Sequence, residues 1–500
     1  MKKCWLRTAS ALIVGIVVLA GASSASAAKT PSPTITGPIT GGAGMPRILS
    51  SSFDLADVGY EGNEYFLAGT AKAYTSATPL ASNGKWKVTP ATGTNATADY
   101  KTRVVVYRPQ AAKDFNGTVI VEWLNVSAGF DSAPDWGLAH RELIRAGSAW
   151  VGVSAQSVGV QGGSMTIAGA APGGLKGGDP ERYASLVHPG DSYSYDMFTQ
   201  VGRAVKGTKK TDPLSGLKAK KVIAIGESQS AFRMVTYIDG IQPIEKVFDG
   251  FFVHSRSNGA ASLSQAPLPV ITPEAPTFIR NDLGVPVMTL QTESDLVLPR
   301  LEYLSARQKD TKNFRLWEVA GTSHADAYTG GIGFSDTGDG KAEAALLDVA
   351  NADGGPLGCT QPINYGPHFS VVSAALHALT NWVADGTAPP RAPRLEVTAG
   401  PPAAITRDAT GNAQGGIRTP LVDAPTAVLR GDGNAGASFC QLFGSTLALN
   451  DEQLAALYPS HKAYVAAFTK SANKAVRDGF MLKPEAKNFI AAAKASNVGG

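Results

Sequence analysis

The sequence predicts an α/β protein with a mostly parallel central sheet that helices cover on both faces. Short runs of apolar residues alternate with amphipathic segments between about residue 117 and residue 321. These runs are apolar throughout, which is typical of strands buried on both faces of a parallel sheet. Shorter alternating runs precede them and predict antiparallel strands. A long amphipathic segment follows them and predicts a closing helix.

The first 27 residues predict a secretory signal peptide. Lys2, Lys3 and Arg7 form a basic start, residues 9–21 an apolar stretch, and residues 25–27 a small-residue cleavage site. We expect cleavage after Ala27, and an uncleaved anchor is the alternative. The mature protein is then expected to be secreted, either to the extracellular space or to the periplasm.

The remaining charge and hydropathy exclude several classes of partner. Loss of three positive charges with the leader lowers the formal net charge from +4 to +1. Lys and Arg do not cluster with aromatic residues, so we expect no nucleic-acid surface. No later stretch has the roughly 18 apolar residues of a membrane span. A phosphate-binding loop and a dinucleotide fingerprint are also missing, so no cofactor is expected.

The mature chain begins with a predicted linker and an antiparallel region. Residues 28–50 are rich in Thr, Pro, Gly and Ser and predict an exported linker. Residues 53–109 hold short alternating runs broken by Gly, Asn and Pro, which predict antiparallel strands.

Strands and helices then alternate through the core. Strands are predicted over 117–126, 149–155, 220–226, 247–255, 285–291 and 314–321, and helices over 136–146, 195–205, directly after Ser228, and 369–384. The Pro-rich stretch 388–397 marks a boundary. We therefore divide the chain into a core domain over 51–400 and an extension over 401–500, with two or three helices over 451–493, that packs on the core and forms a lid or wall.

The turn Gly-Glu-Ser-Gln-Ser is the main indication of chemistry. It joins the apolar strand that ends at Ile225 to an amphipathic helix, and small residues at Gly226 and Ser230 let the strand and helix approach closely. Ser228 is then expected to project alone from the top of the sheet as a nucleophile. A serine that only caps the helix is the alternative.

A serine nucleophile in this position requires an acid and then a histidine further along the chain. Asp295 lies a short loop's length after the strand that ends at Gln291, and Glu293 is the alternative acid. His324, one of only seven histidines, follows the last strand in a loop of small residues. The coincidence of three strand-end positions predicts a Ser-His-Asp triad.

The expected roles follow from proton chemistry. His324 takes the proton of Ser228 as the hydroxyl attacks a carbonyl, and Asp295 fixes the tautomer of the imidazole. The backbone N–H of Gln229 is expected to stabilise the oxyanion, and the second donor is expected at Asn125 or Val126.

These residues lie in longer motifs that resemble the secreted α/β-hydrolase family of serine esterases, and in particular a bacterial subgroup of similar length. The matching pieces are VEWLNVS, HPGDSYSYD, GESQSAFR, QTESD, EVAGTSHAD, GGIRTP and LYPSH, and they cover most of the mature chain from about Gly59. The resemblance implies the α/β-hydrolase fold, ester hydrolysis, and the triad on Ser228, Asp295 and His324. Ser230 departs from the commoner Gly at that position of the turn.

Two cysteines remain after the leader. Because an even pair in an exported protein favours a bridge, we predict a disulfide between Cys359 and Cys440 that ties the extension to the core. The two thiols are far apart and have no nearby histidine spacing, so no metal site is expected.

Three other features allow either a functional or a structural interpretation. Arg418 could clamp a substrate carboxylate in a two-point fork or form an ion pair that holds the extension on the core. Residues 188–196 could line a cleft, although structural hydrogen bonding is favoured. His254 ends a predicted strand and is expected to be a packing residue.

The sequence thus predicts a secreted serine hydrolase that cleaves a small-molecule or polymeric carboxylic ester through an acyl-enzyme. An amidase or peptidase with the same triad is the first alternative. A non-catalytic exported binding protein on a hydrolase scaffold is the second.

Overall fold

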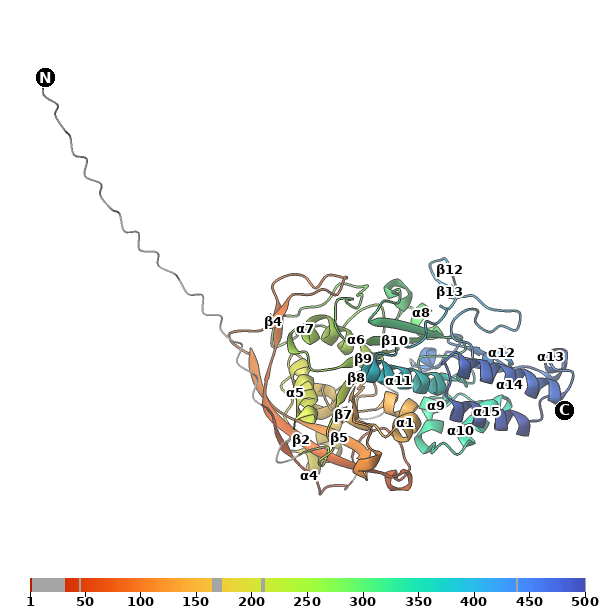
Figure 1. Ribbon diagram of the computed structural model, residues 1–500, viewed down its shortest axis with the longest axis horizontal. Coiled ribbons are helices and arrows are strands. Elements are labelled where there is room, and N and C mark those ends of the chain that lie inside the picture. Colours follow the sequence, from red (N-terminus) through yellow and green to blue (C-terminus); the bar gives the residue numbers. More distant parts are fainter. Residues whose placement is uncertain (2–31, 45, 164–172, 208–211, 438, 500) are drawn as a thin grey trace. The chain divides into compact units, whose positions relative to one another are not determined.

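The computed structural model describes Met1 and residues 32–499 apart from 45, 164–172, 208–211 and 438 (Figure 1). The predicted signal peptide therefore lies outside the described residues, except for Met1. From Ser32 onward the described residues form one compact unit.

A nine-stranded sheet organises this unit, in the order β1-β2-β5-β7-β6-β8-β9-β10-β11. The six strands from β7 to β11 are mutually parallel, whereas β1, β2 and β5 pair antiparallel at the other edge. This confirms the predicted α/β-hydrolase fold, with a mostly parallel sheet and antiparallel N-terminal strands. The strands are β1 (Thr34–Thr36), β2 (Tyr60–Lys72), β5 (Thr97–Pro109), β6 (Thr118–Trp123), β7 (Ala149–Val153), β8 (Lys221–Glu227), β9 (Gly250–His254), β10 (Val287–Thr292) and β11 (Phe314–Val319).

The central strands are apolar throughout because each face of the sheet has its own core. In β6, Val119 and Val121 point into one cluster of buried residues, and Ile120 points into the other. Every residue of β6, β9, β10 and β11 is buried. Burial on both faces explains why the sequence pattern is continuous rather than alternating.

Helices cover both faces of the sheet. Helices α5 (Ser194–Lys206) and α6 (Gln229–Thr236) contribute to the first core, and α1 (Pro134–Ala146) and α11 (His368–Asp385) contribute to the second. The remaining short helices are α2 (Ser157–Gln161), α3 (Gly174–Gly178), α4 (Pro180–Tyr183), α7 (Gln242–Glu245), α8 (Glu293–Val297), α9 (Ala327–Gly330), α10 (Lys341–Leu347) and α12 (Pro420–Asp423).

The antiparallel part is longer and more regular than the sequence indicates. Strands β2 and β5 have 13 residues each and pair along their whole length, from Tyr60 opposite Pro109 to Lys72 opposite Thr97. Within the predicted linker, Thr34–Thr36 forms β1 and pairs with β2. Short hairpins lie outside the large sheet: β3 (Tyr74–Ser76) with β4 (Val88–Pro90), β12 (Val397–Thr398) with β13 (Ala404–Ile405), and β14 (Ala427–Arg430) with β15 (Ser445–Ala448).

The C-terminal hundred residues pack against the sheet and its helices. Ile417 exchanges backbone hydrogen bonds with Glu318 and Ala320 beside β11. Helices α13 (Asp451–Leu457), α14 (His461–Arg477) and α15 (Lys483–Ala495) follow, and the apolar side chains of α14 and α15 join the core shared by α1 and α11. Figure 1 shows α15, in blue, beside α10.

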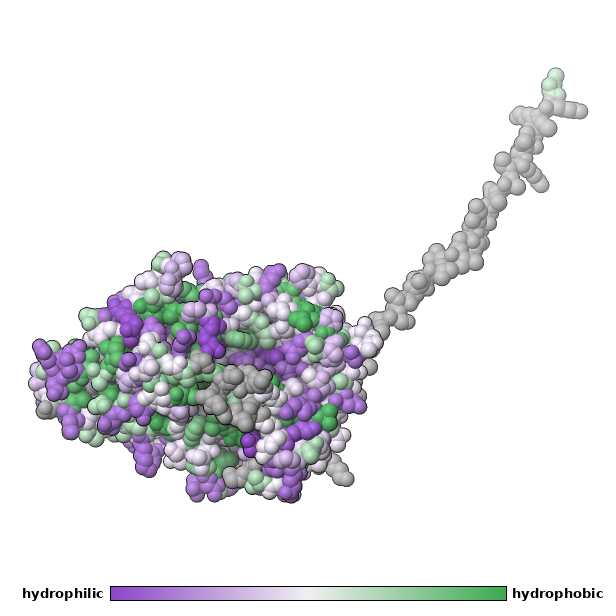
Figure 2. All heavy atoms as spheres, turned by 180° about the vertical axis from the view of Figure 1, so that it is seen from behind, coloured by the Kyte–Doolittle hydropathy of each residue, from purple (hydrophilic) through white to green (hydrophobic). Residues whose placement is uncertain are grey.

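Hydrophilic and hydrophobic residues are interspersed on the face shown in Figure 2. Among the described residues, no helix combines the length and apolar character needed to cross a bilayer.

Candidate active site

Ser228 stands at a sharp turn between β8 and α6. Its backbone has φ +55° and ψ −119°, a conformation that L residues rarely adopt, and its N–H donates to the carbonyl oxygen of His254 at 2.9 Å. A Cβ on Gly226 would lie 3.0 Å from the side chain of Met234 and 3.1 Å from the backbone of Ser230. The close approach of strand and helix therefore favours a residue without a side chain at position 226. Ser230, which stands where the commoner turn has glycine, is fully buried at this contact.

Ser228, His324 and Asp295 form one chain of polar contacts at the carboxyl ends of β8, β11 and β10. Nε2 of His324 lies 2.7 Å from Oγ of Ser228, and Nδ1 of His324 lies 2.6 Å from Oδ1 of Asp295. The N–H of Thr292 donates to the other carboxylate oxygen of Asp295 at 2.7 Å. Burial opposes the charge of Asp295, but His324 and Thr292 outweigh it and lower the pKa of this carboxyl. Asp295 is therefore held ionised against the imidazole.

Glu293, the alternative acid, points elsewhere. Its carboxylate accepts hydrogen bonds from the N–H groups of Gly321 at 2.6 Å and Gly431 at 3.1 Å, and it pairs with Arg407 at 3.1 Å. All of these partners lie away from the imidazole of His324. The geometry therefore favours Asp295 over Glu293 as the partner of the histidine.

The expected oxyanion donors come from the start of α6 and from the loop after β6. Gln229 is the first residue of α6, and no hydrogen bond of its backbone N–H is found within the described part of the chain. The N–H of Asn125 donates to the carbonyl of Ser132 at 2.9 Å, so it is already used. The N–H of Val126 has no such bond to a described residue. Of the two N–H groups predicted for the second donor, that of Val126 is therefore the one without a backbone acceptor among the described residues.

A cavity of about 440 Å³ opens over Ser228 and His324. Its wall is largely apolar and comes from several distant loops. The apolar lining residues include Leu49, Phe232, Leu301, Tyr328, Phe334, Phe439, Leu442 and Phe443.

The last three of these residues belong to a C-terminal segment that a disulfide fixes. Cys359 and Cys440 are joined, as predicted, and Cys440 is fully buried. Phe439 precedes the bridged Cys440, and Leu442 and Phe443 follow it in a 3-10 turn over Cys440–Phe443. The extension therefore forms part of the cavity wall, and the disulfide fixes that part.

Glu227 is a site residue that the sequence analysis did not identify. It lines the cavity next to Ser228, and its Oε1 lies 3.4 Å from Nε2 of His324. Burial raises the pKa of its carboxyl well above the usual range, and the charges of Asp135 and Asp295 add to this. Its position between the Gly and the Ser of the turn was a signal in the sequence that it lies beside the nucleophile. Its contact with the histidine could not be predicted, because that contact depends on where the loop after β11 folds back.

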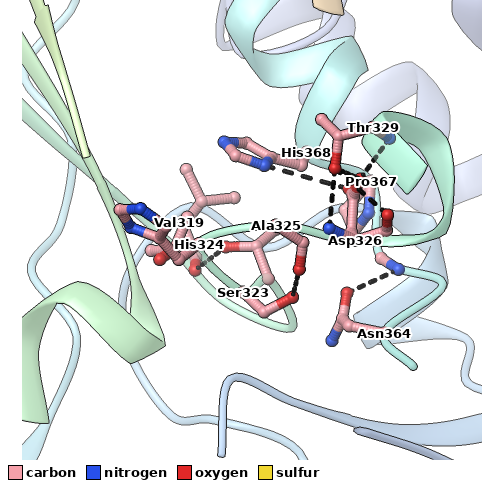
Figure 3. Close-up of polar contacts among 12 residues, drawn as sticks. Val319, Ser323, His324, Ala325, Asp326, Thr329, Asn364, Pro367 and His368 are labelled. Atoms are coloured by element: carbon pink, nitrogen blue, oxygen red, sulfur yellow. Dashed lines mark hydrogen bonds and ion pairs between the residues drawn. The ribbon is translucent and has the colours of Figure 1, made fainter. Parts of the chain in front are cut away.

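A second group of buried polar residues lies behind the triad. Nδ1 of His254 is 2.7 Å from Asp135, and its Nε2 is 2.8 Å from Nε2 of His368. Nδ1 of His368 is 3.8 Å from Asp326, two residues after His324 (Figure 3). Burial lowers the pKa of His254 to about 3, so this residue is a neutral ring in the core, as the sequence predicts for a packing residue. Over the described ranges, no group of three or more His, Cys, Asp or Glu is suited to a metal ion.

Arg418 does not line the cavity. Its guanidinium pairs with Asp408 at 3.0 Å and Asp423 at 2.7 Å, and it also donates to the carbonyl of Ala413. All three partners lie within the C-terminal extension, so the arginine neither faces the cavity nor bridges the extension to the core. A substrate clamp and a tie to the core were the two expected roles, and the observed contacts fit neither.

The segment 188–196 also serves structure. His188 contacts the carbonyl of Ala155 at 3.0 Å, and Asp191 pairs with Arg233 of α6 at 2.8 Å. These contacts tie the segment before α5 to the residues after β7 and to α6.

Comparison with known proteins gives one family and several distant structural neighbours. The family described as alpha/beta hydrolase domain matches residues 35–491. No curated protein matches the sequence.

Three solved structures illustrate the neighbours. An α/β serine hydrolase without lid from Xanthomonas campestris is 16% identical, with 45% of this chain and 80% of that chain covered and a TM-score of 0.27. Acetyl xylan esterase 1 from Thermoanaerobacterium is 12% identical over 58% of this chain and 80% of that chain, with a TM-score of 0.27. A structure from a study of two fungal esterases from Rhizomucor miehei is 10% identical over 54% of this chain and 82% of that chain, with a TM-score of 0.26.

Proposed function

This chain belongs to the alpha/beta hydrolase domain family, and we propose that it is a serine hydrolase that cleaves a carboxylic ester through an acyl-enzyme on Ser228. The observation that carries the proposal is the pair of contacts on His324, with Ser228 at 2.7 Å on one nitrogen and Asp295 at 2.6 Å on the other. A hydroxyl, an imidazole and a buried carboxylate in this arrangement generate a nucleophile at neutral pH.

The reaction proceeds in two steps. His324 takes the proton of Ser228 while Oγ attacks the ester carbonyl, and the proton then passes to the leaving alcohol. Asp295 holds the imidazole in the tautomer that accepts the proton at Nε2. The N–H groups of Gln229 and Val126 stabilise the oxyanion. Water then hydrolyses the acyl-enzyme by the same path.

The cavity wall supports an apolar acyl group. Phe439, Leu442 and Phe443 face the same space as Ser228, and burial of an apolar chain against them is favourable by roughly 0.8 kcal/mol per methylene. Both small and polymeric esters could present such a group at the opening.

Labelling with a fluorophosphonate probe tests the nucleophile. We expect one phosphonyl adduct per chain, and peptide mapping should place it on Ser228. An adduct on another residue, or none at all in folded protein, contradicts the proposal. Preheating the protein above its unfolding temperature provides the matched negative control.

The same assay format tests ester against amide cleavage. We expect turnover of p-nitrophenyl butyrate and little or none of the corresponding p-nitroanilide. Faster cleavage of the anilide would assign the triad to an amidase or peptidase instead.

The proposal includes export of the protein. It is supported by the basic and apolar pattern of residues 1–27 and by the Cys359–Cys440 disulfide, a bond that is typical of oxidising compartments. The mature chain then begins after Ala27 with the linker, and the hydrolase domain and the C-terminal extension follow. N-terminal sequencing of protein recovered from outside the cytoplasm should start at Ala28.

A further inference from the structure

Glu227 occupies a place that the two-step mechanism above leaves unused. It is the last residue of β8 and lines the cavity directly beside Ser228. The side-chain amide of Asn125 donates to its Oε2 at 3.1 Å and to its backbone carbonyl at 3.1 Å. The carboxyl is therefore fixed from one side, and its other oxygen, Oε1, faces Nε2 of His324 at 3.4 Å.

The same nitrogen of His324 has different partners in the two steps. In the free enzyme Nε2 contacts Oγ of Ser228. Once Oγ is part of an ester, it holds no proton to give, and a water must approach Nε2 from the cavity instead. That water needs a second acceptor to orient its lone pair toward the acyl carbon. Glu227 Oε1 is the acceptor beside Nε2 on the cavity side.

We propose that Glu227 binds and orients the water that hydrolyses the acyl-enzyme, and thereby acts in deacylation rather than in acylation; this rests on the proposed function of Ser228. The water gives one proton to Nε2 of His324 as its oxygen bonds to the acyl carbon, and it donates its other O–H to Glu227. The tetrahedral intermediate then breaks the bond to Oγ of Ser228, which takes the proton back from Nε2. Glu227 accepts a hydrogen bond throughout and gains no proton.

A purely structural role does not account for this carboxyl. A buried carboxyl group costs free energy unless donors satisfy it. Within the described part of the chain, Asn125 is the donor to one oxygen, and the contact of the other oxygen is the imidazole. An amide at position 227 would keep the bond from Asn125 and would turn a donor toward the water.

Pre-steady-state kinetics of Glu227→Gln with p-nitrophenyl butyrate test the inference. We expect the burst of p-nitrophenolate, which reports acylation, to stay within a few-fold of wild type. The steady-state rate should fall roughly 10- to 100-fold, the effect of leaving one buried O–H of the water without its acceptor. Intact mass spectrometry should then show the butyryl-enzyme accumulating. Hydroxylamine, a strong nucleophile that needs less positioning than water, should restore most of the turnover.

Two controls keep the outcomes distinct. Glu302→Gln makes the same chemical change at an exposed residue next to Leu301 of the cavity wall, and it should leave both phases unchanged. The rate of fluorophosphonate labelling of Glu227→Gln should match wild type if Ser228 and His324 are intact.

An equal reduction of burst and steady-state rates, or no change in either, would overturn the role of Glu227. Failure of the wild-type protein to label at Ser228 would instead overturn the proposed function itself.

Discussion

Glu293 and Arg407 form an ion pair at 3.1 Å that joins the start of α8, directly after β10, to the C-terminal extension. Glu293 is fully buried in this contact. Two residues later, Asp295 turns the other way and contacts His324 at 2.6 Å. Two carboxylates of one short helix, α8, thus have separate tasks. One holds the extension, and the other holds the imidazole.

Substitution of the two acids should separate these tasks. We expect Asp295→Asn to lower kcat by about 10⁴-fold with little loss of stability, because the amide favours the wrong tautomer of His324. Glu293→Gln should lower the unfolding temperature but keep kcat within a few-fold, measured well below that temperature. The opposite ranking of the two kcat values would move the catalytic acid to Glu293.

Removal of the nucleophile should abolish turnover without unfolding the protein. Ser228→Ala deletes only Oγ, so we expect a loss of at least about 10⁴-fold in kcat and an unchanged circular dichroism spectrum. Residual activity near the wild-type level in Ser228→Ala would show that another group attacks the substrate.

The fold could be predicted from the sequence because burial on both faces leaves a continuous apolar pattern in each parallel strand. The strand-end positions of Ser228, Asp295 and His324 followed from that pattern and from chain order. The length of β2 was missed because Gly62, Asn63 and Gly69 interrupt its alternation, whereas its pairing with β5 along 13 residues tolerates all three. Because Gly and Asn favour turns, these positions were interpreted as breaks between short strands.

The contacts between loops could not be predicted in the same way. Glu227 reaches His324 only because the loop after β11 folds back over β8. The backbone N–H of Asn125 donates to Ser132 in a bridge within its own loop. Because this bridge cannot be predicted from the sequence, the sequence analysis left the choice between Asn125 and Val126 open. Arg418 was expected to reach a substrate or the core, but Asp408 and Asp423 lie nearer to it within the extension.

The disulfide should affect both stability and acyl preference. Replacing Cys359 and Cys440 together with serine removes a cross-link across a sequence separation of 81 residues, which the chain-entropy model values at about 4.5 kcal/mol of unfolding free energy. Because Phe439, Leu442 and Phe443 adjoin Cys440, kcat/KM for a long-chain ester should fall more than kcat/KM for an acetate ester. Urea unfolding and paired ester assays below the unfolding temperature measure the two effects. An equal fall for both esters would show that the bridge does not shape the cavity.

Asp326 should make the stability of the protein depend on pH. Its carboxylate caps α9 by accepting from the N–H of Thr329 at 2.8 Å, and its Oδ2 lies 3.8 Å from Nδ1 of His368. Burial raises the pKa of this carboxyl from 3.8 to about 7, although the bonds from Thr329 oppose the change. The folded state thus keeps a proton that the unfolded state has lost between these two values. The stabilising effect of that proton is complete below about pH 4 and disappears as the pH rises through about 7.

The variant Asp326→Asn keeps the cap and cannot ionise, so it isolates this effect. Relative to wild type, its unfolding free energy should increase by a few kcal/mol as the pH rises from about 4 to about 7, and then stay level. Urea unfolding of both proteins at about pH 4.5, 6 and 8 measures the difference. Thr329→Val provides a control, because it weakens the cap and leaves the ionisable group in place. A constant difference between Asp326→Asn and wild type at all three pH values would mean that Asp326 does not titrate in the folded protein over this range.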